Sequence, residues 1–206
     1  MSAQEYVNTD FYLVDDGSDD GTFEILDSWK SPNVKVTRNF ENKGLRETII
    51  NFLEICQFEK YDFIGKMDND CGVPANWMNY ILGVFNNWPE VEILSPNVHP
   101  SNAAFVYGKK VEGLPYMPAK LVGGLWFMRG NLLFGLDFQK YGTDGLTGAI
   151  ALLKQIVVEK SPIIAWLPHL IVEDMGHWSG THPEHIKSKD HAEYSKVVGR
   201  DVAWTA

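Results

Sequence analysis

In Lys66-Met67-Asp68-Asn69-Asp70-Cys71, two carboxylates stand one residue apart at the end of a short apolar run. Phe63 and Ile64 before it indicate a buried strand, and Pro74 after it suits the first turn of a helix. On the turn that follows a strand, both carboxylates can converge on one point, where they repel each other unless a cation lies between them. Oxygen ligands of this kind suit Mg²⁺ or Mn²⁺, which also hold phosphates. The alternative is a solvated Asp-Asn turn without a ligand.

Length and composition limit the class of protein. The chain has 206 residues, of which 45% are hydrophobic and 22% charged, as in one globular domain or a little more. Its net charge of −9 disfavours nucleic acid or an anionic membrane as a partner, since either would require a basic face. Cys56 and Cys71 have no motif spacing and indicate a reducing compartment. Because the sequence shows neither a signal peptide nor an apolar run of about 18 residues, we expect a cytoplasmic protein without an integral membrane segment.

Strands and helices are predicted to alternate in the first half of the chain. Apolar runs predict strands over 11–14, 34–37 and 63–67, and helices start at Thr22, at Gly44 and at Pro74. The first helix would carry Phe23, Leu26 and Trp29 at the spacing of one face. The second has the clearest apolar stripe, made of Leu45, Ile49, Phe52, Leu53 and Cys56. This alternation predicts an α/β fold with a mainly parallel sheet and helices on both of its faces.

Charged residues gather where these elements begin and end. The strands over 11–14 and 63–67 both end in acidic clusters, and in open α/β sheets ligands bind at the carboxyl edge. Lys43 and Arg46 lie at the start of the second helix, where the helix dipole favours anions rather than cations. They indicate an anionic ligand nearby, although two solvated basic side chains are the alternative.

The second half of the chain is less regular. Short strands are predicted at 93–95 and 163–167, with a long irregular segment over 96–120. An apolar run over 121–128 is interrupted by Gly123-Gly124, which indicates a close approach of another group to the backbone. Asp144 lies in a Gly-Thr-Asp-Gly turn that opens a helix, and His177 belongs to a histidine-rich tail.

The string Val14-Asp15-Asp16-Gly17-Ser18-Asp19-Asp20-Gly21-Thr22 resembles the nucleotide-binding motif of family 2 glycosyltransferases, enzymes of the GT-A fold. Asn42-Lys43-Gly44 is similar to that family's Asn-x-Gly element, and Asp68-Asn69-Asp70 to its Asp-x-Asp metal motif. Gly123-Gly124 with Arg129 is similar to the Gly-rich strand that precedes the acceptor site. The motifs occur in the family's order, and the resemblance covers residues 10–180.

The resemblance implies a single GT-A domain over 1–206, with a nucleotide-binding part over 10–95 and an acceptor-binding part and tail over 96–206. It implies a hexosyltransferase that moves a sugar from a nucleoside-diphosphate sugar, with UDP as the expected nucleotide. The acceptor would be a hydroxyl of a saccharide or another molecule, the transfer would invert the anomeric centre, and Mn²⁺ or Mg²⁺ would be the cofactor.

The same resemblance implies roles for individual residues. One carboxylate of Asp15 and Asp16 would accept hydrogen bonds from the base, Asp68 would face the ribose or the metal, and Asp70 would bind the metal. His177 would complete the metal site, with a structural histidine as the alternative. The remaining candidates are Asp144 as the catalytic base, with Glu173 and Asp174 as substitutes, and Lys43 and Arg46 as partners of the diphosphate.

The chain departs from the family pattern at its start, because the family's first, central strand has no counterpart before Phe11. The strands over 11–14 and 63–67 should then pair directly, or borrow a strand from residues 1–9 or from a neighbouring chain, in which case a homo-oligomer forms. A shortened, non-catalytic relative that binds nucleotide sugars is the main alternative function. A sugar-1-phosphate nucleotidyltransferase is a weaker one, because the sequence lacks the N-terminal Gly-rich loop of those enzymes.

Overall fold

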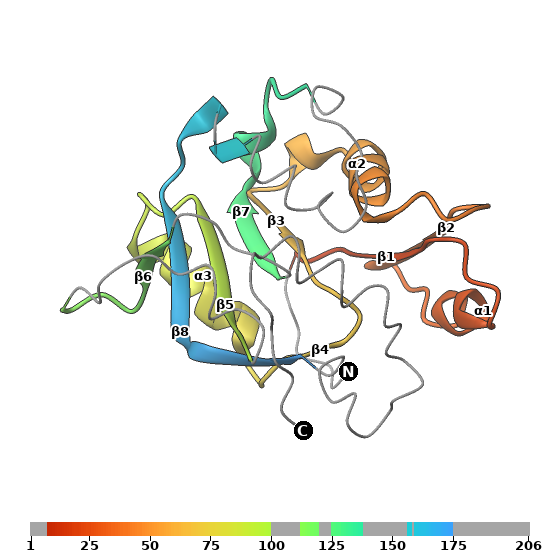
Figure 1. Ribbon diagram of the computed structural model, residues 1–206, viewed down its shortest axis with the longest axis horizontal. Coiled ribbons are helices and arrows are strands. Elements are labelled where there is room, and N and C mark those ends of the chain that lie inside the picture. Colours follow the sequence, from red (N-terminus) through yellow and green to blue (C-terminus); the bar gives the residue numbers. More distant parts are fainter. Residues whose placement is uncertain (1–7, 100–111, 120–124, 138–155, 158, 175–206) are drawn as a thin grey trace, which may run out of the picture. The chain divides into compact units, whose positions relative to one another are not determined.

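The computed structural model describes residues 8–99, 112–119, 125–137, 156–157 and 159–174 (Figure 1). The chain divides into two compact units. The first comprises Met1–Lys60 and Gly135–Leu152, and the second comprises Tyr61–Phe134 and Leu153–Ala206. Across the described ranges, no helix has the length and apolar character needed to cross a membrane.

The first unit is a β-α-β-α succession. It contains β1 (Phe11–Asp15), α1 (Thr22–Asp27), β2 (Val34–Arg38) and α2 (Leu45–Cys56), followed by the 3-10 turn Phe58–Lys60. β1 and β2 pair in parallel, with a register that runs from Phe11 opposite Val34 to Asp15 opposite Arg38. The predicted order of strands and helices is confirmed here. Because the strands are parallel and in register, their carboxyl ends lie side by side.

The two helices of this unit differ in how much they bury. α2 buries Ile49, Leu53 and Cys56 of the predicted stripe, and its Phe52 ring lies 5.2 Å from that of Tyr12 on β1. α1 has no buried residue, and it ends at Asp27. The prediction that Trp29 shares a helix face with Phe23 and Leu26 is therefore wrong, and Trp29 is 52% exposed. The reason is that the backbone N–H of Trp29 already bonds the carbonyl of Leu26, which closes the helix in a tight turn.

The second unit is built on a six-stranded sheet. Its strands run in the order β3-β7-β5-β8-β4, with β6 beside β8. In chain order, the elements are β3 (Phe63–Lys66), β4 (Cys71–Gly72), α3 (Trp77–Asn87), β5 (Ile93–His99), β6 (Met117–Ala119), β7 (Trp126–Arg129), the 3-10 turn Gly130–Leu133 and β8 (Ile164–Asp174).

The pairings correct the prediction of a mainly parallel sheet. β1–β2 and β5–β8 are parallel, whereas β3–β7, β5–β7, β4–β8 and β6–β8 are antiparallel. Parallel neighbours require a crossover connection, and β7 lies between β3 and β5, whose connection along the chain runs through β4 and α3. β7 follows β5 and β6 in the chain and is not part of that crossover, so it can pair antiparallel with both β3 and β5.

Aromatic packing joins α3 to the sheet of the second unit. Phe85 of α3 stacks on Phe63 of β3 at 4.7 Å between ring centroids, and Trp77 lies 5.5 Å from Phe127 of β7. Arg129 lies over the Phe63 and Phe85 rings and donates to the carbonyl oxygens of Phe85 and Val91 at 2.7 and 2.9 Å. This arginine, part of the Gly-rich pattern in the sequence, therefore stabilises the framework.

The two strands that end in acidic clusters belong to different sheets. β1 pairs with β2, and β3 pairs with β7. Direct pairing of 11–14 with 63–67, one of the predicted ways to replace the family's first strand, is not among the pairings of the described strands. The prediction that both acidic clusters lie at the edge of one sheet is therefore wrong for these strands.

Candidate functional site

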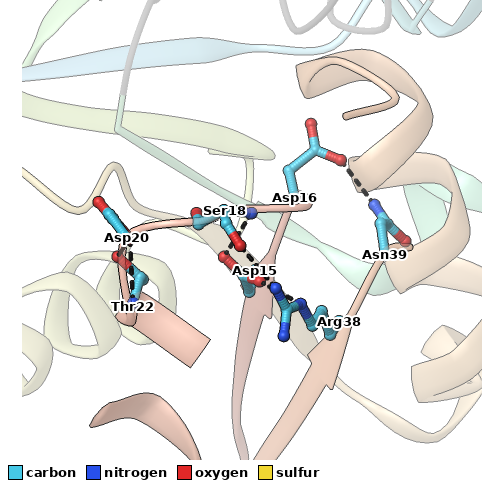
Figure 2. Close-up of polar contacts among 7 residues, drawn as sticks. All are labelled: Asp15, Asp16, Ser18, Asp20, Thr22, Arg38 and Asn39. Atoms are coloured by element: carbon cyan, nitrogen blue, oxygen red, sulfur yellow. Dashed lines mark hydrogen bonds and ion pairs between the residues drawn. The ribbon is translucent and has the colours of Figure 1, made fainter. Parts of the chain in front are cut away.

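Asp15, the last residue of β1, is part of the framework of the first unit. Its side chain is 0% exposed, and Oδ2 lies 3.2 Å from Nε of Arg38. That contact is ionic rather than a directional hydrogen bond, because Oδ2 accepts none from the described residues. Oδ1 accepts a hydrogen bond from the backbone N–H of Ser18 at 3.3 Å. Figure 2 shows the carboxylate turned toward Arg38.

Asp16 connects the ends of both strands to the loop that precedes α2. Its Oδ1 accepts from the side-chain amide of Asn39 at 2.7 Å and from the backbone N–H of Lys43 at 3.0 Å (Figure 2 shows the Asn39 bond). Its Oδ2 accepts from the backbone N–H of Gly44 at 2.9 Å. Partial burial raises the pKa of Asp16, but hydrogen bonds from Asn39, Lys43, Thr48 and Gly44 outweigh it and hold the pKa below its usual value.

Gly17 allows the same loop to approach the backbone closely. It has a φ of +80°, and a Cβ placed on it would lie 2.7 Å from the carbonyl carbon of Glu41 and 2.8 Å from the nitrogen of Asn42. Any larger residue would therefore force residues 41–42 away. The structure thus places the Asp-Asp-Gly turn against the Asn-x-Gly element, a contact that the order of the two motifs in the sequence did not predict.

Lys43 and Arg46, the two predicted phosphate partners, differ in environment. Arg46 is buried in the first turn of α2, and its Nη1 lies 2.9 Å from Oε1 of Glu47. Lys43 is exposed, and its backbone N–H is bound to Asp16. The Lys43 side chain therefore meets an anionic ligand in water more readily than the Arg46 side chain does.

The depressed pKa of Asp16 makes an acid-stability prediction. A carboxylate whose pKa is lower in the folded state stabilises the protein fully above its unfolded-state pKa of 3.8, and this stabilisation is lost as the pH falls through the folded-state pKa. Chemical unfolding as a function of pH should therefore show a stability difference between the parent and Asp16→Asn that is constant above pH 5 and shrinks below about pH 3.8. A difference that persists undiminished at pH 2 would contradict this expectation.

The Asp68–Asp70 turn lies between β3 and β4 of the second unit. Nζ of Lys66 forms an ion pair with Oδ1 of Asp68, and the Lys66 side chain is only 11% exposed. After the turn, Cys71 and Gly72 pair with Asp174 and Glu173 at the end of β8. The backbone positions of the two substitute base candidates thus lie beside the strand that follows the predicted metal motif.

The donor chemistry of this turn fits Mg²⁺ or Mn²⁺ in part. Asp68 and Asp70 supply the oxygen atoms that hard cations prefer, but no three metal-binding side chains gather within the ranges that the structure describes. One or two carboxylates with water and phosphate oxygens are a common ligand set for Mg²⁺. Asp144, His177 and Gly123-Gly124 lie outside the described residues.

Sequence reasoning missed three residues that hold these turns, namely Arg38, Asn39 and Lys66. A signal was available for the first two. If 11–15 and 34–38 are parallel strands in register, a basic residue and an amide at the end of the second must lie beside the carboxylates at the end of the first. Lys66 could have been noticed as a cation two residues before Asp68, on the same side of an extended strand.

Comparison with known proteins decides the family. A family model described as glycosyl transferase family 2 matches residues 1–161. This chain belongs to glycosyl transferase family 2. Among curated proteins, no sequence match was found. The match covers the Asp-Asp-Gly turn, the Asn-x-Gly element and the Asp-x-Asp motif, so the resemblance drawn from those residues is confirmed.

Two solved glycosyltransferases are similar in fold. GalNAc-T7, solved with UDP, GalNAc and Mn²⁺, is 15% identical with a TM-score of 0.57, over 81% of this chain and 37% of that one. The mannosyltransferase PcManGT from Pyrobaculum calidifontis, solved with GDP-Man and Mn²⁺, is 15% identical with a TM-score of 0.53, over 91% of this chain and 55% of that one. This family 2 member therefore has the predicted GT-A fold, and it spans about half or less of these two proteins.

Proposed function

We propose that this family 2 member is an inverting, metal-dependent hexosyltransferase that moves a sugar from a UDP-sugar to a hydroxyl of a saccharide or another acceptor. The observation that carries the proposal is the arrangement around Asp16. The family's Asp-Asp-Gly turn and Asn-x-Gly element are held against each other by hydrogen bonds of 2.7–3.0 Å from Asn39, Lys43 and Gly44 to one carboxylate. These hydrogen bonds hold the Asp16 carboxylate in one orientation, which supports a role in binding the nucleotide base.

Different charged residues would bind different parts of the nucleotide-sugar donor. Asp16 is the better of the two adjacent carboxylates for the base, because Asp15 is buried against Arg38. Asp68 and Asp70, with His177, would hold Mn²⁺ or Mg²⁺, which supplies positive charge that stabilises the leaving diphosphate when bound. Lys43, exposed at the start of α2, and Arg46 add to that charge. Both solved proteins named above contain Mn²⁺, which supports the choice of metal.

Asp144 is the proposed general base. It takes the proton from the acceptor hydroxyl while the hydroxyl oxygen forms a bond to the anomeric carbon. The bond from that carbon to the diphosphate oxygen breaks at the same time, and the nucleoside diphosphate leaves from the opposite face. Attack from one face and departure from the other inverts the anomeric centre.

The metal part of this proposal is tested with Asp70→Asn and thermal unfolding. Saturating UDP with Mn²⁺, at about 100 times its Kd, should raise the Tm of the parent by about 5–10 °C. Measured against its own Tm without ligand, Asp70→Asn should lose most of that rise, because a hard cation loses affinity when one of its few charged oxygen ligands is removed.

Two controls sharpen the experiment. Asp62→Asn removes an exposed carboxylate just before β3 and should keep the full ligand-induced rise in Tm. GDP with Mn²⁺ should raise the Tm of the parent less than UDP does. An Asp70→Asn protein that responds to UDP with Mn²⁺ as the parent does would refute Asp70 as a ligand.

A non-catalytic nucleotide-sugar-binding relative is the alternative function, and one observation favours it. The carboxylate of Asp68 is already paired with Lys66, which gives the turn a cation of its own. Such a protein would be stabilised by UDP without added metal and would release no UDP from any UDP-sugar, with or without acceptor. Metal-dependent release of UDP from a panel of UDP-sugars separates the two functions.

A further inference from the structure

Arg38 contacts three separate segments of the first unit. Its Nε lies 3.2 Å from Oδ2 of Asp15 at the end of β1, and its Nη2 donates to the carbonyl oxygen of Ser18 at 2.6 Å. Its guanidinium carbon lies 5.0 Å from the centroid of the Phe23 ring at the start of α1. Figure 2 shows the guanidinium beside Asp15 and Ser18, with dashed lines to both.

The carboxylate of Asp15 needs a cation where it lies. Its side chain is fully buried, and a buried carboxylate destabilises the fold unless it is paired and hydrogen-bonded. The planar guanidinium presents several N–H groups in a fixed fork, so one arginine can serve the carboxylate with one edge and the Ser18 carbonyl with another. Lysine has a single ammonium group, so it cannot bind the Asp15 carboxylate and the Ser18 carbonyl in the geometry that the guanidinium allows.

Asp16 lies between the two groups that Arg38 holds. Asp15 precedes it and Ser18 follows it by two residues, so the guanidinium fixes the chain on both sides of the proposed base-binding carboxylate. We infer that Arg38 is a positioning residue: through Asp15 and Ser18 it sets the direction in which Asp16 faces the loop over residues 42–44 and the nucleotide. This inference rests on the proposed function, since it assigns the nucleotide to Asp16.

The same two strands provide a matched control at their other end. Lys35 of β2 donates to Oδ2 of Asp10 at 3.2 Å and to the hydroxyl of Tyr12 at 2.9 Å, and its Nζ lies 4.7 Å from the Tyr12 ring centroid. It is thus another β2 cation with a carboxylate and an aromatic ring as partners. Neither of these partners belongs to the turn around Asp16. Replacing Lys35 therefore reports the general cost of losing an ion pair on β1 and β2.

The experiment compares the parent with Arg38→Lys, Arg38→Gln and Lys35→Gln. Amide hydrogen exchange is measured without ligand at Ser18, Lys43 and Gly44, whose N–H groups bind Asp15 and Asp16. Affinity for UDP with Mn²⁺ is measured by calorimetry at a temperature well below every variant's Tm. Arg38→Lys should speed exchange at these amides and weaken UDP binding, each about tenfold, as expected for one lost charge-assisted hydrogen bond. Lys35→Gln should leave both quantities within about twofold of the parent.

Several outcomes would overturn the inference. Parent-like exchange at the three amides in Arg38→Lys and Arg38→Gln would show that Arg38 does not hold the turn. Faster exchange with an unchanged Kd for UDP would show that its role is structural alone, and equal losses in Lys35→Gln would show a general effect of stability. A parent that binds neither UDP nor GDP with Mn²⁺ would refute the proposed function, while the exchange data would still decide whether Arg38 positions Asp16.

Discussion

Replacing Asp144 by asparagine is expected to lower kcat about 10²–10⁴-fold, the contribution typical of a positioned general base. Asparagine keeps the size of the side chain but cannot take the acceptor's proton. Because the carboxylate is not assigned to the nucleotide, the Kd for UDP with Mn²⁺ should stay at the parent value. The measurement is the rate of UDP release from a UDP-sugar in the presence of acceptor, with calorimetry for the Kd.

Glu173→Gln and Asp174→Asn are the matched variants for this test. Their backbone positions pair with Gly72 and Cys71, directly after the Asp68–Asp70 turn, so either could supply the base instead. Each should keep kcat within about threefold of the parent if Asp144 is the base. If Asp144→Asn keeps its activity and one of these two variants loses it, the base belongs to the end of β8.

Replacing Asp16 by asparagine should weaken binding of UDP with Mn²⁺ about 100-fold and destabilise the fold by about 1–3 kcal/mol. Asparagine keeps one acceptor oxygen, and its Nδ2 is a donor. At the place of Oδ1 this donor would face the Asn39 amide and the Lys43 N–H, and at the place of Oδ2 it would face the Gly44 N–H, all of which are donors as well. The loop over residues 42–44 would then move away from the end of β1, and the base would lose the charged acceptor that the carboxylate provides. Calorimetry gives the affinity, and urea unfolding gives the free energy of unfolding.

Asp20→Asn is the control for that result. Asp20 belongs to the same motif, but it is exposed, and its Oδ1 accepts from the backbone N–H and the hydroxyl of Thr22, the first residue of α1, at 3.0 and 2.6 Å. Its replacement should leave the Kd for UDP near the parent value. An Asp16→Asn protein that is destabilised yet binds UDP as tightly as the parent would restrict Asp16 to the framework.

Local patterns were sufficient for much of the first unit. A short apolar run predicts a strand and a 3.6-residue stripe predicts a helix from neighbouring residues alone, and β1, β2 and α2 form where these patterns lie. The nine-residue string from Val14 to Thr22 was enough to predict the family, because the residues of this motif are consecutive in the sequence.

Strand pairing was beyond such patterns. An apolar run indicates that a strand is buried, but it does not indicate which strand lies beside it or whether the two strands run parallel or antiparallel. The partners of β7 illustrate this, because it pairs antiparallel with β3 and β5 although only β4 and α3 lie between those two along the chain. Long-range contacts of this kind depend on the packing of whole elements, which no single segment encodes.

The pair Asp15-Asp16 separates what the sequence determined from what the tertiary structure decided. The sequence placed two equivalent carboxylates at the end of a strand and left open which one serves a ligand. Only the fold sets Arg38 opposite Asp15 and brings residues 42–44 against Asp16. Asp15 is the last residue of β1 and Asp16 begins the turn after it, and the two carboxylates have different partners. One becomes a buried ion-pair partner and the other the hydrogen-bonded centre of the turn, because partners distant in the sequence arrive on different sides.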